Sequence, residues 1–145
     1  MAVTVNAIRP RAIHPIHPLH AVLLAGTFTL FLSALLNDLA YRSTYQVQWT
    51  NFASWLIAGG LALGGIALVF ALVGLRHAVR RSGPSLFYLL LLLASWIVGL
   101  FNAVVHAKDA YAAMPGGLLL SVIAAVLAGA ATWLGFSSPR TGDPS

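Results

Sequence analysis

Charged residues divide the chain into four long uncharged segments. These segments are residues 12–37, 43–75, 82–107 and 110–139, and the shortest of them has 26 residues. An α-helix crosses the hydrocarbon core of a bilayer, which is roughly 30 Å thick, with about 20 residues. A charge at the centre of such a helix costs roughly 2.5 to 3.5 kcal/mol even on the mildest scale. The pattern therefore predicts four transmembrane helices, at about residues 19–41, 49–75, 85–107 and 116–136.

The prolines agree with these helix limits. Proline disrupts a helix interior and disfavours helix in the residue before it. All seven prolines lie outside the expected helix interiors: three precede the first helix, Pro84 and Pro115 stand just before the third and fourth, and two follow the last. We therefore expect residues 1–145 to form a single all-α domain, a bundle of four transmembrane helices.

Composition narrows the function class. The chain is 59% hydrophobic and 8% charged, whereas an ordinary soluble domain is roughly 25% charged. It contains no cysteine, which excludes disulfides, thiolate nucleophiles and covalently attached c-type haem. The net charge of +5 comes from basic residues at the membrane boundaries, and these set membrane topology. We therefore expect a lipid bilayer around the chain and no nucleic-acid partner.

The basic residues also predict an orientation. With four spans, the two termini and the middle loop lie on one side and carry six Lys and Arg, whereas the other side carries only Arg42 and Lys108. Short loops rich in Lys and Arg stay in the cytoplasm. Both termini are thus expected to be cytoplasmic, with the two other loops facing outward into the periplasm of a bacterial inner membrane.

Polar side chains gather at the outward ends of the helices. At 100° per residue, Ser95, Gly99, Asn102 and His106 form one stripe of the third helix, and Asp109 lies three residues beyond His106. The first helix has a similar face that ends in an acidic residue; its members are His20, Thr27, Phe31, Ala34 and Asp38. A carboxylate beside an imidazole sets its tautomer and its affinity for a proton. The outer end is therefore a candidate proton, quinone or metal site, the alternative being that these groups only join helix ends.

Histidines at the opposite end define a second candidate. His20 and His77 could supply the two axial ligands of a b-type haem or bind a transition metal, a minority hypothesis. The motif HPIHPLH adds His14 and His17, but the intervening prolines prevent a regular helical presentation of these ligands.

Four sequence motifs together resemble a known family. IHPIHPLHAVLLAG, LLNDLAY, QWTNFASWLIAGG and FNAVVHAKDAYAAMPGGLLLS, in that order, are similar to the bacterial membrane proteins of domain-of-unknown-function family 2231 (DUF2231), from about Ile13 to Leu134. The resemblance implies a small four-helix inner-membrane protein associated with quinoprotein sugar dehydrogenases or c-type cytochromes. The matching positions are His20, Asp38, Trp49, Asn51, Trp55, Asn102, His106 and Asp109. This chain has Asn37 where a serine is usual, and because it has no CxxCH motif any haem c would come from a partner.

Three functions follow as alternatives. The first is an accessory membrane subunit or anchor for a periplasmic redox enzyme, linked to electron transfer through quinone or haem b and not an enzyme by itself. It predicts a quinone-sized pocket beside His106 and Asp38. The second is a structural or assembly protein without a small ligand. The third is a small transporter or pore, which the apolar helix centres disfavour. Whether copies form a homo-oligomer is left open.

Overall fold

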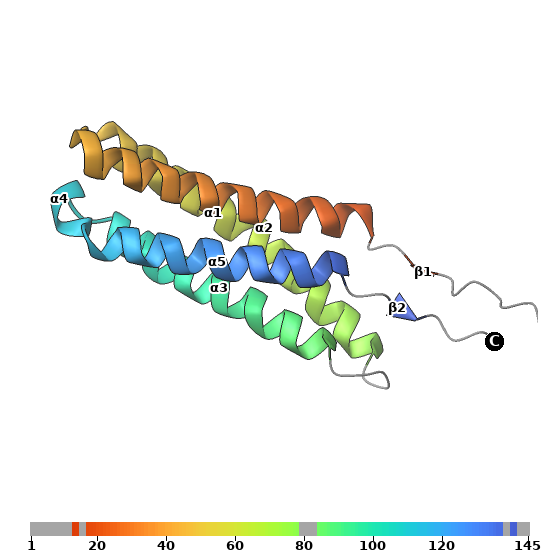
Figure 1. Cartoon of the computed structure of the whole chain (residues 1–145). Helices are drawn as coiled ribbons and strands as arrows, with labels where there is room; N and C mark the ends of the chain where they lie inside the picture. The colour runs from red at the N-terminus through yellow and green to blue at the C-terminus, as the bar shows by residue number, and fades with distance from the viewer. Residues whose placement is uncertain (1–12, 15–16, 79–83, 138–139, 142–145) are drawn as a thin grey trace, which may run out of the picture.

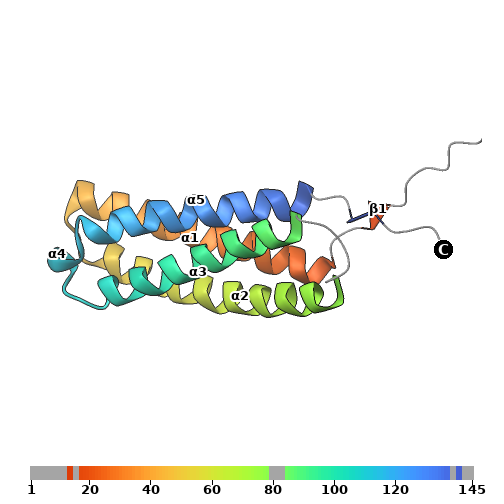
Figure 2. The same cartoon turned by 90° about the horizontal axis from the view of Figure 1, so that it is seen from below.

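Four long helices form an antiparallel up-and-down bundle (Figure 1). The computed structural model describes residues 13–14, 17–78, 84–137 and 140–141. The long helices are α1 (Pro18–Thr44), α2 (Gln48–Ala78), α3 (Pro84–His106) and α5 (Gly116–Ser137). A one-turn helix, α4 (Ala110–Ala113), joins α3 to α5, and the two-residue strands β1 (Ile13–His14) and β2 (Arg140–Thr141) pair antiparallel. Figure 2 shows α4 and the α1–α2 connection at one end of the bundle, here called the α4 end, and the strands at the other.

The four predicted spans are confirmed. The segments long and apolar enough to cross a membrane are Pro18–Thr44, Gln48–Gly74, Leu86–His106 and Gly116–Ser137. Two helices begin at a proline, Pro18 in α1 and Pro84 in α3, where the missing N–H costs no helical hydrogen bond. The chain is thus an all-α, multi-pass membrane protein apart from its short strand pair. The predicted limits miss only a few terminal residues of each helix and the single turn of α4.

The core follows a heptad rule. The buried residues of α1 recur at intervals of four and three, and they include Leu24, Thr27, Phe31, Ala34 and Asp38. Such spacing is typical of helices that pack in a left-handed bundle. Each neighbouring pair of helices packs along its length, so that α1 and α3 face each other diagonally across the centre. The face of α1 that carries His20, Thr27, Phe31, Ala34 and Asp38 therefore lies on the inside of the bundle.

α1 and α3 are aligned with a constant offset of 68 residues. Three separate contacts share this offset: His20 with Tyr88, Phe31 with Gly99, and Asp38 with His106. Because α2 lies between them in the chain, α1 and α3 run in the same direction, and the same offset holds at both ends of the bundle. Two polar contacts between these helices therefore stand at opposite ends of the bundle, with the apolar core between them.

Glycines bring the helix backbones close together. A Cβ built at Gly60 or Gly99 would lie 2.6 or 2.8 Å from the ring of Phe31, which is almost fully buried. A Cβ at Gly64 would contact Thr27 and the indole of Trp96, and one at Gly65 would contact the same indole. The indole Nε1 donates a hydrogen bond to the carbonyl oxygen of Leu61 at 2.9 Å. Small residues at helix contacts allow this close approach in membranes. Gly60, Gly64 and Gly99 therefore lie at contacts between helices.

Candidate functional site

Four polar side chains from three helices meet inside the bundle near the α4 end. They are Asp38 on α1, Asn102 and His106 on α3, and Ser121 on α5, and we call them the polar ring. His106 Nε2 lies 2.8 Å from Asp38 Oδ1, and Ser121 Oγ donates to Asp38 Oδ2 at 2.5 Å. Asn102 Nδ2 donates to Ser121 Oγ at 2.8 Å, and His106 Nδ1 lies 3.0 Å from the carbonyl oxygen of Asn102. The contacts thus close a circuit that begins and ends at Asn102.

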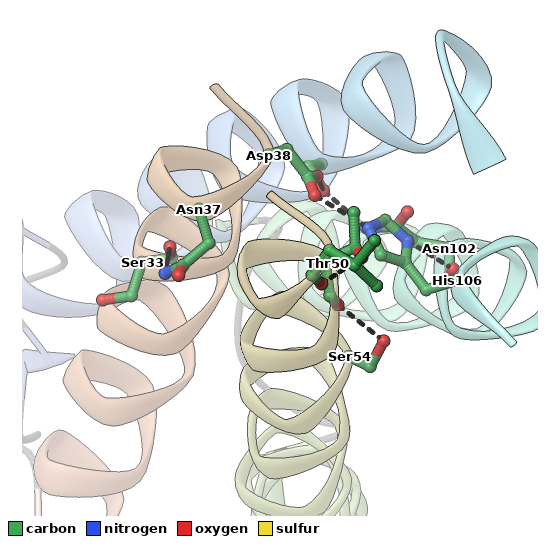
Figure 3. A network of polar contacts seen from close by, with 9 residues as sticks. Ser33, Asn37, Asp38, Thr50, Ser54, Asn102 and His106 are labelled. Carbon is green, nitrogen blue, oxygen red and sulfur yellow. Dashed lines mark hydrogen bonds and ion pairs between the residues drawn. The ribbon is translucent and has the colours of Figure 1, made fainter. Parts of the chain in front are cut away.

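The helix geometry explains why these residues meet. Asn102 and His106 are four residues apart, so they share one face of α3. The 68-residue offset brings Asp38 opposite His106, and Figure 3 shows their side chains pointing toward each other from α1 and α3. Ser121 lies in the second turn of α5, which packs against both other helices. The ring therefore joins α1, α3 and α5.

The polar ring is closed to solvent. The side chains of Asp38 and His106 are 0% exposed, and Asn102 and Ser121 are 1% exposed as whole residues. An unpaired charge at such a depth costs several kcal/mol. These polar groups can therefore be buried only because they form hydrogen bonds with one another. Asn102 Oδ1 accepts no hydrogen bond from the residues that the structure describes.

Gly117 forms the wall against His106. A Cβ at position 117 would lie 2.8 Å from Cε1 of the imidazole and 3.3 Å from its Nδ1. No side chain other than hydrogen leaves room for the ring in its present position. Gly117 is thus part of the site because its lack of a side chain leaves room for the imidazole of His106 between α3 and α5.

A cavity of about 350 Å³ opens at the α4 end beyond the polar ring. Its lining is mostly aromatic and apolar, with one cation, and consists of Tyr41, Arg42, Tyr45, Tyr111, Met114, Pro115 and Leu118. Tyr41 follows Asp38 on α1 by three residues, a rise of about 4.5 Å, and Leu118 is the neighbour of Gly117. Tyr45 ends α1 in a left-handed conformation, with φ 55°, which turns the chain at the rim.

One of three comparisons with known proteins identifies a family. A family model described as predicted membrane protein (DUF2231) matches residues 16–138, most of the chain. The chain belongs to the DUF2231 family. Comparisons with curated proteins and with solved structures found no match.

Within this DUF2231 fold, the sequence-predicted outer-end residues separate into two groups. Asp38, Asn102 and His106 are brought together in the polar ring. Asn51 and Asp109 are exposed, and Trp55 is 74% exposed on α2. Asp109 stands just before α4 and its side chain does not cap that helix. The carboxylate in contact with His106 is therefore Asp38, from a distant part of the chain, and not its near neighbour Asp109.

Sequence reasoning missed two members of the DUF2231 site. Neither Ser121 nor Gly117 was predicted as a site residue. Their common signal is the spacing of Gly117, Ser121 and Ala125, which lie four residues apart on the buried face of α5. Only the packing of α5 against α3 reveals that the first two face His106 and Asn102.

Among the described residues, no three His, Asp or Glu side chains lie close enough together to hold a metal ion. His20 is buried, and its Nε2 lies 2.8 Å from the hydroxyl of Tyr88. His17 is exposed. The side chains of His14 and His77 lie outside the described residues, so the predicted pairing of His20 with His77 stays a prediction.

Proposed function

We propose that this DUF2231 protein is an accessory membrane subunit or anchor of a redox enzyme and holds a quinone headgroup at the α4 end. The observation that carries the proposal is the cavity of about 350 Å³ beside the polar ring. Ligand pockets in proteins measure about 300 to 1,000 Å³ and combine apolar walls with a few polar groups. A headgroup fits the lower end of this range.

The lining suits the chemistry of a quinone. Aromatic rings of Tyr45 and Tyr111 offer apolar faces, and Arg42 and the tyrosine hydroxyls are hydrogen-bond donors for the two carbonyl oxygens. A quinone carries two electrons and two protons between redox partners. Asp38 and His106 do not line the cavity, so the pocket expected directly beside them lies one helical turn further out. Two residues of the cavity are close in the chain to residues of the site: Tyr41, three residues after Asp38, and Leu118, next to Gly117.

The proposed setting follows from the distribution of basic residues. Six Lys and Arg on the side of both termini against two at the α4 end favour cytoplasmic termini. The cavity would then face the periplasm of a bacterial inner membrane. A periplasmic dehydrogenase or a c-type cytochrome could reach it there, and such a partner would supply the catalytic centre.

Photolabelling with an azidoquinone tests the ligand. In the purified chain in lipid nanodiscs, labelling should fall on the cavity residues and should be lost when an unlabelled short-chain ubiquinone competes. Leu118→Trp fills the cavity and should abolish this specific labelling. The matched control is Leu119→Trp, since Leu119 is 62% exposed and faces away from the bundle. Labelling that is spread over lipid-facing residues and is insensitive to competition and to Leu118→Trp contradicts the proposal.

Haem b is the weaker cofactor candidate. A bis-histidine haem needs two imidazole nitrogens available at one depth, and Nε2 of His20 is engaged with Tyr88. Ligation of haem iron by Nε2 of His20 would therefore break its contact with Tyr88. A visible spectrum of the purified protein with and without dithionite tests this branch, because a Soret band that shifts on reduction would favour haem over quinone.

A structural or assembly role is the second candidate, and the closed polar ring favours it. Asp38, His106 and Ser121 are hydrogen-bonded to one another and to Asn102, which is what a helix clamp requires. Quinone-linked respiration that is unchanged in cells carrying His106→Ala or Asp38→Asn would favour this role. A pore has less support. The buried hydroxyls of Thr27 and Ser95 donate to backbone carbonyls of the helices, so they do not extend the polar ring into a polar path across the membrane.

A further inference from the structure

The two termini of the hydrogen-bond circuit have fixed roles. The side-chain amide nitrogen of Asn102 can only donate, and the backbone oxygen of the same residue can only accept. Between these points lie one hydroxyl, one carboxyl and one imidazole, whose hydrogens can be arranged in more than one way. The fixed termini remove most of that freedom.

From the donor terminus, the hydrogens follow in order. Ser121 Oγ receives a hydrogen from Asn102 Nδ2 and has a single hydrogen of its own. That hydrogen is directed to Asp38 Oδ2, 2.5 Å away. Oδ2 is therefore an acceptor and carries no proton, so any proton on the Asp38 carboxyl must be on Oδ1, which faces His106.

From the acceptor terminus, the imidazole is fixed as well. His106 Nδ1 lies 3.0 Å from the backbone oxygen of Asn102, which has no hydrogen. Nδ1 must therefore be protonated, because otherwise two lone pairs would face each other inside the membrane. The same reasoning applies at 2.8 Å between Nε2 and Asp38 Oδ1, where one hydrogen must stand between the two atoms.

We propose that Asp38 and His106 form a proton-binding site that holds one proton between Oδ1 and Nε2. The proton is bonded either to Nε2, giving an imidazolium and a carboxylate, or to Oδ1, giving a neutral imidazole and a carboxylic acid. Both arrangements make the pair electrically neutral overall. Neutrality fits the location, since removing this proton would leave a net negative charge in a region from which water is excluded.

No other charged group contacts Asp38 or His106 in the described structure, so none could neutralise the carboxylate if the proton left. Buried residues of α2 near this level are Thr50 and Ala53, and α5 contributes Gly117 and Ser121, none of them ionisable. The ionisable groups of the α4 end are mostly exposed, apart from the buried Tyr41, and none of them has a hydrogen bond or ion pair to the pair in the described structure: Tyr41, Arg42, Tyr45, Lys108, Asp109 and Tyr111. The shared proton is thus the positive charge that neutralises the carboxylate of Asp38. The inference is independent of the quinone proposed above.

Nitrogen NMR of the whole chain tests the site. The protein is labelled with ¹⁵N-histidine in lipid nanodiscs at neutral pH, and the His106 signals are assigned as those lost in His106→Gln and kept in His20→Gln. We expect a protonated Nδ1. Infrared spectra of wild type and Asp38→Asn then show whether a carboxylic-acid carbonyl band belongs to Asp38.

Each outcome decides the proposal. A protonated Nδ1 supports it when Nε2 is also protonated, or when Nε2 is bare and Asp38→Asn removes a carboxylic-acid band. In Asp38→Asn the new amide should donate to Nε2, so His106 should become neutral with Nδ1 still protonated. An unprotonated Nδ1 in the wild type overturns the proposal, as does a bare Nε2 without an Asp38 acid band.

Discussion

Gly117 packs so closely against the imidazole of His106 that a Cβ at position 117 would come within 2.8 Å of Cε1. Its neighbour Gly116 has no atom within 4 Å of the corresponding position. Of these two adjacent glycines at the start of α5, only Gly117 is required by close packing against the polar ring.

Gly117→Ala should destabilise the bundle. The added methyl group must displace His106 or push α5 outward, and overpacking of this kind costs about 1 to 3 kcal/mol. Thermal unfolding in a fixed detergent gives the comparison, with Gly116→Ala as the control that should unfold like the wild type. Equal unfolding temperatures for the two variants would contradict the close contact.

Removal of the Asp38 side chain should be among the most damaging single changes at the site. Asp38→Ala leaves Nε2 of His106 and the hydroxyl of Ser121 buried without their partner, and breaking a buried pair in this way costs about 3 to 5 kcal/mol. Asp38→Asn keeps one acceptor and one donor and should cost less. Asp109→Asn, at an exposed position, should leave the unfolding curve unchanged; a loss as large as that of Asp38→Ala would make Asp109 the relevant carboxylate.

The contact between Phe31 and Gly99 should appear as energetic coupling. Gly99→Ala drives a methyl group into the Phe31 ring, and Phe31→Leu gives that methyl group space. The double variant should therefore lose less stability than the sum of the two single variants, by about 0.5 to 3 kcal/mol. Gly74→Ala, where a Cβ meets open space, provides the uncoupled control. Strict additivity of Gly99→Ala and Phe31→Leu would argue against the close packing of α1 on α3.

Trp96→Phe should weaken the contact between α2 and α3 modestly. It removes the hydrogen bond from the indole nitrogen to the Leu61 carbonyl, and such bonds between transmembrane helices contribute about 0.6 kcal/mol on average and up to about 1.7. Trp133→Phe serves as the control because Trp133 is 74% exposed. The measurement is the midpoint of denaturation in mixed micelles; identical midpoints for the two variants would remove the proposed role of Trp96.

The inner faces of the helices were predictable, but their partners were not. Periodicity alone identified the stripe of Asn102 and His106 on α3 and the face of Asp38 on α1, because a residue's place around a helix depends only on its number. It favoured Asp109 as the partner of His106 by the same local rule. That rule fails where α3 ends at His106 and α4 begins beyond Asp109, since the helical spacing no longer applies there.

By itself, the sequence determined that this protein crosses a membrane four times and determined which helix faces turn inward. The physical reason is that hydrophobicity and helical periodicity are local properties, and a charge-free segment of sufficient length has a low free energy only in lipid. The tertiary structure decided that Asp38 meets His106, that Ser121 and Gly117 complete the site, and that the cavity lies one turn beyond it. These relations depend on the 68-residue alignment of α1 with α3 and on the position of α5, which result from the packing of side chains far apart in the chain.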